Sequence, residues 1–255
     1  MSDLLQVWKN FKPETPPFIL DGDKSFLNDS TLSKNTITHD WHSYNECSHF
    51  GDESECRFHL GLRPLPFAGN LKNSKLFILM LNPGFNPSDY YAEYQSNEFV
   101  QALQKTYRQD DDVKNIFLEP RFSWHSGFSY WHKKLSTLIN AYALNKNITR
   151  FKALQIFQEK ISFLEAYPYH SQNFKHSSFL KDLYSKIIII DFVKKVLVDK
   201  AKKGEVLLLV LRGNDLWKLV VETNIIVFEK SECRAGHINE KTRDGKILNF
   251  LLSTT

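Results

Sequence analysis

The sequence predicts an α/β fold: a four-stranded, mostly parallel sheet covered on both faces by helices, in a three-layer α/β/α arrangement. Three observations predict it. Continuously apolar runs of strand length recur along the chain, amphipathic stretches of helix length lie between them, and Pro or Gly follows most of the runs. The 255 residues are 42% hydrophobic and 24% charged, which excludes disordered, collagen-like and coiled-coil proteins.

The expected strands are short apolar runs that end at turn-forming residues. The run KLFILML is ended by Asn82, Pro83 and Gly84, and its length is that of a buried strand. KISFLEA is followed by a second proline, Pro168, and EVLLLVL is followed by an Arg-Gly-Asn turn. Together these patterns predict four strands, at residues 75–81, 160–166, 205–211 and 224–228.

The expected helices lie between these runs. Residues 96–109 and 128–144 are amphipathic, and an irregular stretch, 110–127, separates them. Residues 184–203 are ambiguous, because four isoleucines favour a strand whereas the length and the Lys pairs favour a buried helix with a basic outer face. A short helix is expected at residues 215–223 and a closing helix at residues 239–252.

The N-terminal segment differs from the remainder in charge. Residues 1–56 hold four Lys and ten Asp or Glu, a net charge of −6, so residues 57–255 carry +10. Residues 1–60 also lack hydrophobic periodicity and contain several prolines. We therefore expect an acidic, irregular N-terminal extension at 1–60 and one basic α/β domain at 61–255, whose charge suits a polyanionic partner.

The cysteine count and the apolar runs indicate the cellular compartment. Three cysteines, an odd number, do not suit a disulfide framework and are typical of a reducing compartment. No apolar run approaches the ~20 residues of a membrane-spanning helix, and no signal peptide follows Met1. These features predict a cytoplasmic protein.

Two cysteines and four histidines lie within residues 39–59 and could supply zinc ligands, although their spacing fits no strong finger template. The alternative is a His-rich surface segment, and we expect no metal or other cofactor. The six residues are His39, His42, Cys47, His49, Cys56 and His59.

Polar and aromatic residues follow each expected strand. Ligands of α/β sheets bind beyond the carboxyl ends of the strands, so these segments are candidates for one site. The alternative is that they are only turns. The segments are Asn82–Phe85, Glu165–Ser171, Arg212–Asn214 and Cys233–Asn239.

The sequence Leu-Met-Leu-Asn-Pro-Gly-Phe at 79–85 resembles a strand-end motif of the uracil-DNA glycosylase superfamily, and is closest to that of the mismatch-specific uracil/thymine glycosylases. Pro-Leu-Pro-Phe-Ala-Gly-Asn at 64–70 matches the approach to that strand. Residues 234–239 occupy the place of the family's His-Pro-Ser loop but lack its proline and serine. The resemblance covers roughly residues 63–252. It implies the family's single α/β/α domain and a DNA partner.

The resemblance implies a role for several residues. Asn82 would position the attacking water through its amide oxygen. His237 would stabilise negative charge on the departing base, and Phe85 would stack on the flipped base. The alternatives are a turn-capping Asn, a core Phe and a His without a ligand.

Glu165 stands where relatives that excise uracil place an Asn. A carboxylate accepts a hydrogen bond from the amine of cytosine and repels the carbonyl of uracil, which predicts a cytosine-like base, including 5-substituted cytosine. The alternative is an ion-paired carboxylate. Beside Glu165, the expected base-binding residues are Tyr167, Tyr169 and His170, and the expected DNA contacts are Ser171, Arg212, Arg234 and the wedge Ile238.

No lysine lies in these motifs, so we expect a monofunctional glycosylase that leaves an abasic site. Excision would serve either repair or antiviral defence. One alternative is a nucleic-acid-binding protein that keeps the fold without catalysis. Another is an unrelated enzyme acting on a phosphorylated small molecule, although no Gly-rich phosphate loop is found. We expect no membrane and no obligate protein partner.

Overall fold

The structure is a computed structural model, and it describes residues 3–27, 36–48, 50–52, 54–175, 178–229, 231–232 and 237–254. The chain divides into two compact units. Unit 1 comprises Met1–Phe67, Leu81–Arg108 and Glu165–Val193. Unit 2 comprises Ala68–Met80, Gln109–Leu164 and Lys194–Thr255.

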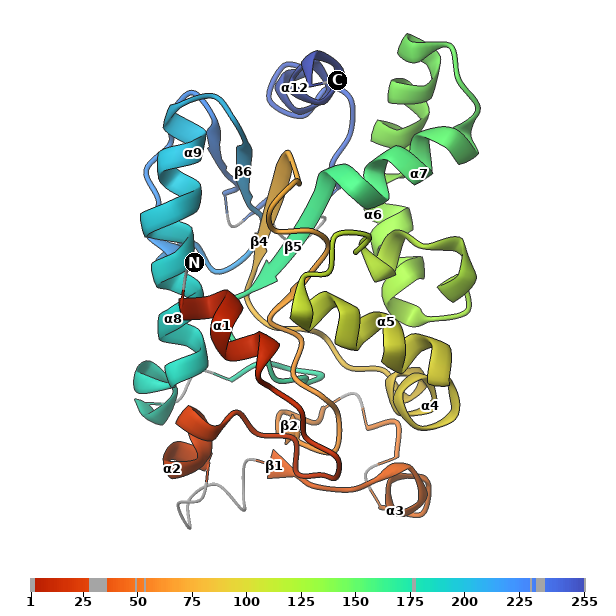
Figure 1. The fold of residues 1–255 in the computed structure, drawn as a ribbon, viewed down its shortest axis with the longest axis vertical. Coiled ribbons are helices and arrows are strands. Elements are labelled where there is room, and N and C mark those ends of the chain that lie inside the picture. Colours follow the sequence, from red (N-terminus) through yellow and green to blue (C-terminus); the bar gives the residue numbers. More distant parts are fainter. Residues whose placement is uncertain are drawn as a thin grey trace. The chain divides into compact units, whose positions relative to one another are not determined.

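The main sheet has five strands in the order β3-β5-β4-β6-β7 (Figure 1). The pairs β4–β6 and β6–β7 are parallel, with Leu76 opposite Leu207 and Leu208 opposite Ile225. The mixed α/β class and the mostly parallel sheet are therefore confirmed. The strands are β3 (Phe67–Ala68), β4 (Leu76–Met80), β5 (Ile161–Glu165), β6 (Leu207–Val210) and β7 (Ile225–Val227).

The fifth strand corrects the expected number of four. It is the two-residue edge strand β3, which lies where the sequence predicts only a turn-rich approach. Gly69 follows it with φ +101°, and a Cβ at this position would lie 2.6 Å from the carbonyl oxygen of Ile161 on β5. Two residues are too few for a periodic pattern. The only sign of β3 in the sequence is therefore Gly69, because glycine permits this close approach of two backbones.

Helices cover the sheet in a coarse α/β/α arrangement, with α6 and α7 on one side and α9 on the other (Figure 1). The ring of Trp131 on α6 stacks on Phe163 of β5 with centroids 3.6 Å apart. The helices of unit 2 are α6 (Ser126–Lys146), α7 (Arg150–Lys160), α9 (Val198–Lys202), α10 (Asn214–Trp217) and α12 (Lys246–Ser253), with the 3-10 turns η2 (Ile116–Leu118) and η3 (Pro120–Phe122).

Two expected helices are shorter than predicted because the backbone turns left-handed. Lys218, with φ 50°, ends α10. Arg243, Asp244 and Gly245 all have positive φ, so α12 begins only at Lys246. The ambiguous stretch 184–203 is helical up to Lys202, as α8 (Tyr184–Phe192), the π-helical turn η5 (Val193–Leu197) and α9.

The N-terminal residues belong to unit 1 and contribute to its core. Trp8 is fully buried and stacks on Tyr107 of α5 at 5.8 Å, and Tyr44 stacks on Tyr90 of α4 at 4.2 Å. The elements of unit 1 are α1 (Asp3–Lys9), η1 (Asp21–Asp23), α2 (Lys24–Leu27), β1 (Thr36–Ile37), α3 (Trp41–Asn45), β2 (Phe58–His59), α4 (Pro87–Gln95), α5 (Asn97–Arg108), η4 (Ser178–Asp182) and α8.

Among the described residues, no helix is long and apolar enough to cross a membrane.

Candidate functional site

Unit 1 brings together the segments that follow β4 and β5. The backbone N–H of Tyr167 donates to the carbonyl of Leu81 at 2.9 Å, and that of Ser171 donates to the carbonyl of Pro83 at 3.3 Å. Six predicted site residues lie on these two segments, and a seventh, Glu165, is the last residue of β5: the six are Asn82, Phe85, Tyr167, Tyr169, His170 and Ser171.

The side chain of Asn82 is fixed by its amide nitrogen. Nδ2 donates to the hydroxyl of Ser171 at 2.9 Å and to the carbonyl of Pro83 at 2.8 Å, which uses both of its hydrogens. None of the described residues donates a hydrogen bond to Oδ1 of this half-buried side chain. Because the amide nitrogen is held by Ser171 and Pro83, the direction of the carbonyl oxygen is fixed, and this oxygen can accept a hydrogen bond from water.

His170 holds the turn that contains Asn82. Its Nδ1 lies 2.9 Å from the carbonyl oxygen of Gly84, to which it donates, and 3.9 Å from the carboxylate of Asp89. Burial lowers the pKa of His170 to about 4, so the ring is neutral at pH 7. The predicted base-binding residue thus contacts the turn itself, and we describe it as a positioning residue.

Phe85 is half-buried and lies against a histidine. The ring of His59 stacks on it with centroids 3.7 Å apart and an interplanar angle of 11°. Tyr44 and Tyr90 meet Phe85 edge-to-face, at 5.6 and 6.0 Å. The rings described therefore occupy one face and the edges of Phe85. At the adjacent Gly84, an added Cβ would meet nothing within 4 Å, so this side of the turn is open.

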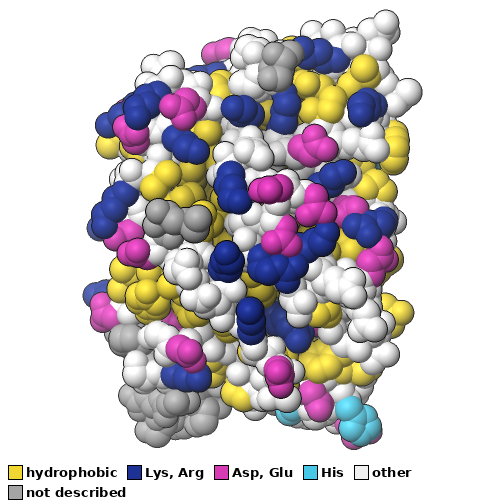
Figure 2. Space-filling view, viewed as in Figure 1, with side chains coloured by type: hydrophobic (Ala, Val, Ile, Leu, Met, Phe, Trp, Pro, Cys, Tyr) yellow, Lys and Arg dark blue, Asp and Glu magenta, His cyan; other side chains and the backbone are white. Residues whose placement is uncertain are grey.

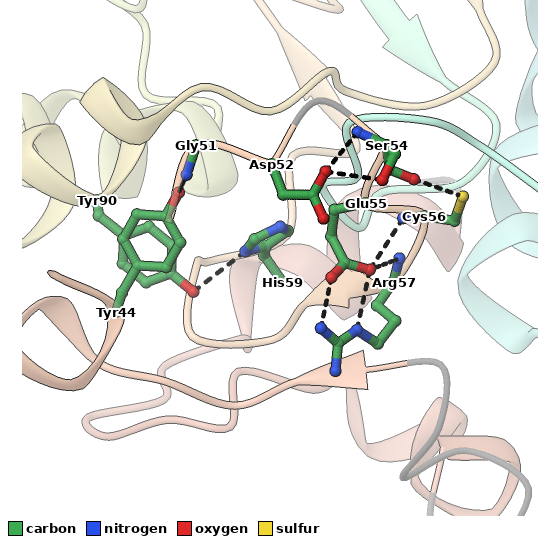
Figure 3. Close-up of polar contacts among 9 residues, drawn as sticks. All are labelled: Tyr44, Gly51, Asp52, Ser54, Glu55, Cys56, Arg57, His59 and Tyr90. Atoms are coloured by element: carbon green, nitrogen blue, oxygen red, sulfur yellow. Dashed lines mark hydrogen bonds and ion pairs between the residues drawn. The ribbon is translucent and has the colours of Figure 1, made fainter. Parts of the chain in front are cut away.

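His59 belongs to this site although its sequence pattern suggested only a zinc ligand. Its Nδ1 lies 3.3 Å from the hydroxyl of Tyr90, on which Tyr44 stacks (Figure 3). Burial, with a smaller contribution from nearby His170, lowers the pKa of His59 to about 3. No local motif predicts the stack on Phe85, because the two residues are brought together only by the fold of unit 1.

The loop before β2 is held by its own polar groups (Figure 3). Arg57 pairs with Glu55, and this pairing holds the pKa of the Glu55 carboxyl at about 2. Cys56 donates from Sγ to the carbonyl of Ser54 at 3.2 Å. Over the part of the chain that the structure describes, no three His, Cys, Asp or Glu side chains gather as metal ligands. His49, one of the six zinc candidates, lies outside that part.

Tyr169 has no exposed surface, which corrects its predicted role. Its hydroxyl donates to the carboxylate of Asp23 at 2.7 Å and accepts from the backbone N–H of Leu20 at 3.2 Å. Tyr167 is also buried, and its ring lies 4.8 Å from that of Phe174. Because the Tyr169 hydroxyl is bound inside unit 1, we no longer assign Tyr169 to base binding, whereas the role of Tyr167 stays a prediction.

Glu165 lies at the end of β5, as predicted, and is buried. Its backbone N–H donates to the carbonyl of Pro66 at 2.9 Å. Its role in reading the base stays a prediction.

Four predicted residues lie in unit 2. Arg212 and His237 are exposed, and Arg234 lies outside the described residues. Ile238 has 0% exposed surface, and its backbone N–H donates to the carbonyl of Lys134 on α6 at 3.1 Å. A core side chain is not available as an intercalating wedge, so we withdraw that assignment.

The two units differ in charge. Unit 1 holds 11 Lys and Arg against 16 Asp and Glu, a net of −5, whereas unit 2 holds 22 against 13, a net of +9. The basic surplus therefore belongs to the unit without Asn82. On the face drawn in Figure 2, the visible Lys and Arg side chains are interspersed with carboxylates.

Comparison of the chain with protein-family models, curated proteins and solved structures finds no match. The resemblance to the uracil-DNA glycosylase superfamily therefore stays a prediction based on the motifs in the sequence.

Proposed function

We propose that this protein is a monofunctional DNA glycosylase of the cytoplasm, similar in fold to the uracil-DNA glycosylases. It would flip a damaged or modified base out of DNA and hydrolyse its N-glycosidic bond, leaving an abasic site. One observation carries the proposal: both hydrogens of the Asn82 amide are bound within unit 1, at Ser171 and Pro83, while its carbonyl oxygen accepts from no described donor.

This arrangement suits the chemistry of base hydrolysis. An amide oxygen is a weak base, so Asn82 would orient water toward a sugar that already carries positive charge as the base departs. Ser171 would keep the amide from rotating. The exposed Gly84 leaves room for a nucleotide to approach Phe85, whose ring would support the base by stacking.

The substrate proposed is a cytosine-like base, including a 5-substituted one. The support is the position of Glu165, a buried carboxyl group at the end of β5, where it would accept a hydrogen bond from the exocyclic amine. His237, on unit 2, remains the proposed stabiliser of the departing base. Excision of a modified base from a viral genome would be defence, and excision of rare damage would be repair.

The test is an abasic-site assay on duplexes that carry uracil, mismatched thymine or 5-substituted cytosines. We expect abasic sites to form in at least one substrate. In Asn82→Ala the rate of base excision should fall about 100-fold or more, because the group that orients the water is gone. Asn145→Ala is the matched control, because Asn145 is an exposed amide on α6 that donates to Ala141. Binding without product on every substrate would instead support a catalytically inactive nucleic-acid-binding protein.

Two further variants examine the same site. Ser171→Ala frees the Asn82 amide and should lower kcat about tenfold with KM nearly unchanged, as expected for a group that positions another. Glu165→Asn should move base preference from cytosine-like bases toward uracil. An unchanged preference would end the assignment of Glu165 to base reading.

A further inference from the structure

The segment from Pro120 to Gln158 contains no Asp or Glu, although it holds six Lys and Arg. At the average frequency of the chain, 29 acidic residues in 255, these 39 positions would hold about four. The segment includes all of α6 and most of α7, which pack against each other in unit 2 (Figure 1). All of α6 and the first nine residues of α7 thus present cations without carboxylates of their own, and the one carboxylate of α7, Glu159 near its C-terminal end, pairs with Lys114.

Arg150, the first residue of α7, is held along α6 by neutral groups. Its Nε donates to the amide oxygen of Asn140 at 2.8 Å, and its Nη2 donates to Nε2 of His132 at 2.6 Å. Burial lowers the pKa of His132, and the Arg150 charge lowers it further. The ring is therefore neutral and accepts the hydrogen bond at Nε2. Among the described residues, no carboxylate lies within ion-pair distance of Arg150.

Other arginines of the chain differ in this respect. Each of four is paired with a glutamate close to it: Arg57 with Glu55, Arg63 with Glu93, Arg121 with Glu119 and Arg243 with Glu232. Arg150 therefore has a fixed guanidinium whose charge is not balanced by an ion pair. Nη1 has no described hydrogen-bond acceptor either, so the fork can still bind an oxyanion with two oxygens.

An aromatic surface continues from this arginine along α6. Phe128 stacks on His132 with an interplanar angle of 12° and centroids 5.4 Å apart. Phe128 and His132 are four residues apart and are therefore neighbours on the helix surface, and Arg150 joins His132 to Asn140 about two turns further along. Phe128, His132 and Asn140 are not buried. A cation that binds phosphate beside an aromatic ring that stacks on bases is the usual composition of a single-strand binding surface.

We infer that Arg150, His132, Asn140 and Phe128 form a binding site for single-stranded nucleic acid, with Arg150 on a backbone phosphate and Phe128 beneath a base. The positive end of the α7 dipole lies at Arg150 and favours the same anion. This site and the proposed base-excision site would both bind nucleic acid, but they have no residue in common. Its failure and the failure of base excision are therefore distinguishable.

The test is fluorescence anisotropy of the full chain with a labelled oligothymidine of about 20 nucleotides, at several salt concentrations. Arg150→Gln is expected to weaken binding about tenfold and to make the salt slope shallower by about 0.7, the value for one phosphate contact on a single strand. Arg243→Gln is the matched control, because it removes the same charge from unit 2 where Glu232 already balances it. Equal affinities of the two variants would overturn the inference.

Two measurements keep the test decisive if Arg150→Gln does not fold. Arg150→Lys keeps the charge but not the planar fork, and should weaken binding about threefold. Wild-type affinity in that variant would contradict the proposed contact. With the wild-type chain, polyglutamate should compete far less well than unlabelled oligothymidine. Equal competition would show an unspecific anion surface or an acidic-peptide site instead, and would likewise overturn the inference.

Discussion

Replacing His59 by Phe should alter how the stability of the protein depends on pH. His59 is 1% exposed and its pKa in the folded protein is lowered to about 3 by burial, against 6.5 for the exposed side chain. Below pH 6.5 the unfolded chain therefore binds a proton that the folded chain does not bind. The stability that the neutral ring contributes is complete above pH 6.5 and is lost progressively as the pH falls.

The size of this effect follows from the two pKa values. Each pH unit below 6.5 costs about 1.4 kcal/mol of unfolding free energy for one such proton, so between pH 7 and pH 5 the loss is about 2 kcal/mol. His59→Phe preserves a ring against Phe85 but carries no proton. When the pH is lowered from 7 to 5, the unfolding free energy of the variant should therefore fall by about 2 kcal/mol less than that of the wild type.

The pH dependence of the unfolding free energy must be compared between variant and wild type, because other buried groups change stability with pH in the opposite direction. Burial raises the pKa of Glu93 to about 8 despite its ion pair with Arg63, so the folded chain gains stability from this group as the pH falls from 8 toward 4.5. Burial also raises the pKa of Asp23. Subtracting the wild-type curve from that of the variant removes both contributions.

The assay is urea denaturation of both proteins at four pH values from 5 to 8, with His42→Gln as control because His42 is exposed on α3. The control should follow the wild-type curve. A difference between His59→Phe and wild type that stays constant within about 0.5 kcal/mol over this range would refute the reasoning. In that case His59 would not be a neutral buried ring.

Three further outcomes are expected. Tyr169→Phe should lower the unfolding free energy by about 2 kcal/mol in urea titration, because it removes the hydrogen bond to Oδ2 of Asp23, whose Oδ1 keeps the Ser185 N–H, and leaves the Leu20 N–H unpaired inside unit 1; a change below about 0.5 kcal/mol would contradict this. Gly84→Val should leave stability nearly unchanged but abolish base excision if the nucleotide crosses this open position, and full activity would place the nucleotide elsewhere. Borohydride should trap no covalent complex with substrate DNA, whereas trapping would reveal a lysine Schiff base.

The sequence predicted the elements whose pattern is local. The runs before Asn82 and Pro168 form β4 and β5, and the two amphipathic stretches form α5 and α6. It did not predict α4 or α7, whose boundaries depend on the caps Asn86 and Thr149 rather than on a strong apolar face. The edge strand β3 was missed because two residues carry no period.

By itself, the sequence determined the α/β class and placed Asn82 and Ser171 in the segments that follow two strands, and the carboxyl ends of parallel strands lie at one edge of a sheet. Only the tertiary structure decided which of these side chains remain accessible. It buried Tyr169 against Asp23, set His59 on Phe85 and assigned the basic surplus to unit 2. Burial and stacking join residues far apart in the chain, and local patterns of residue type carry no record of such contacts.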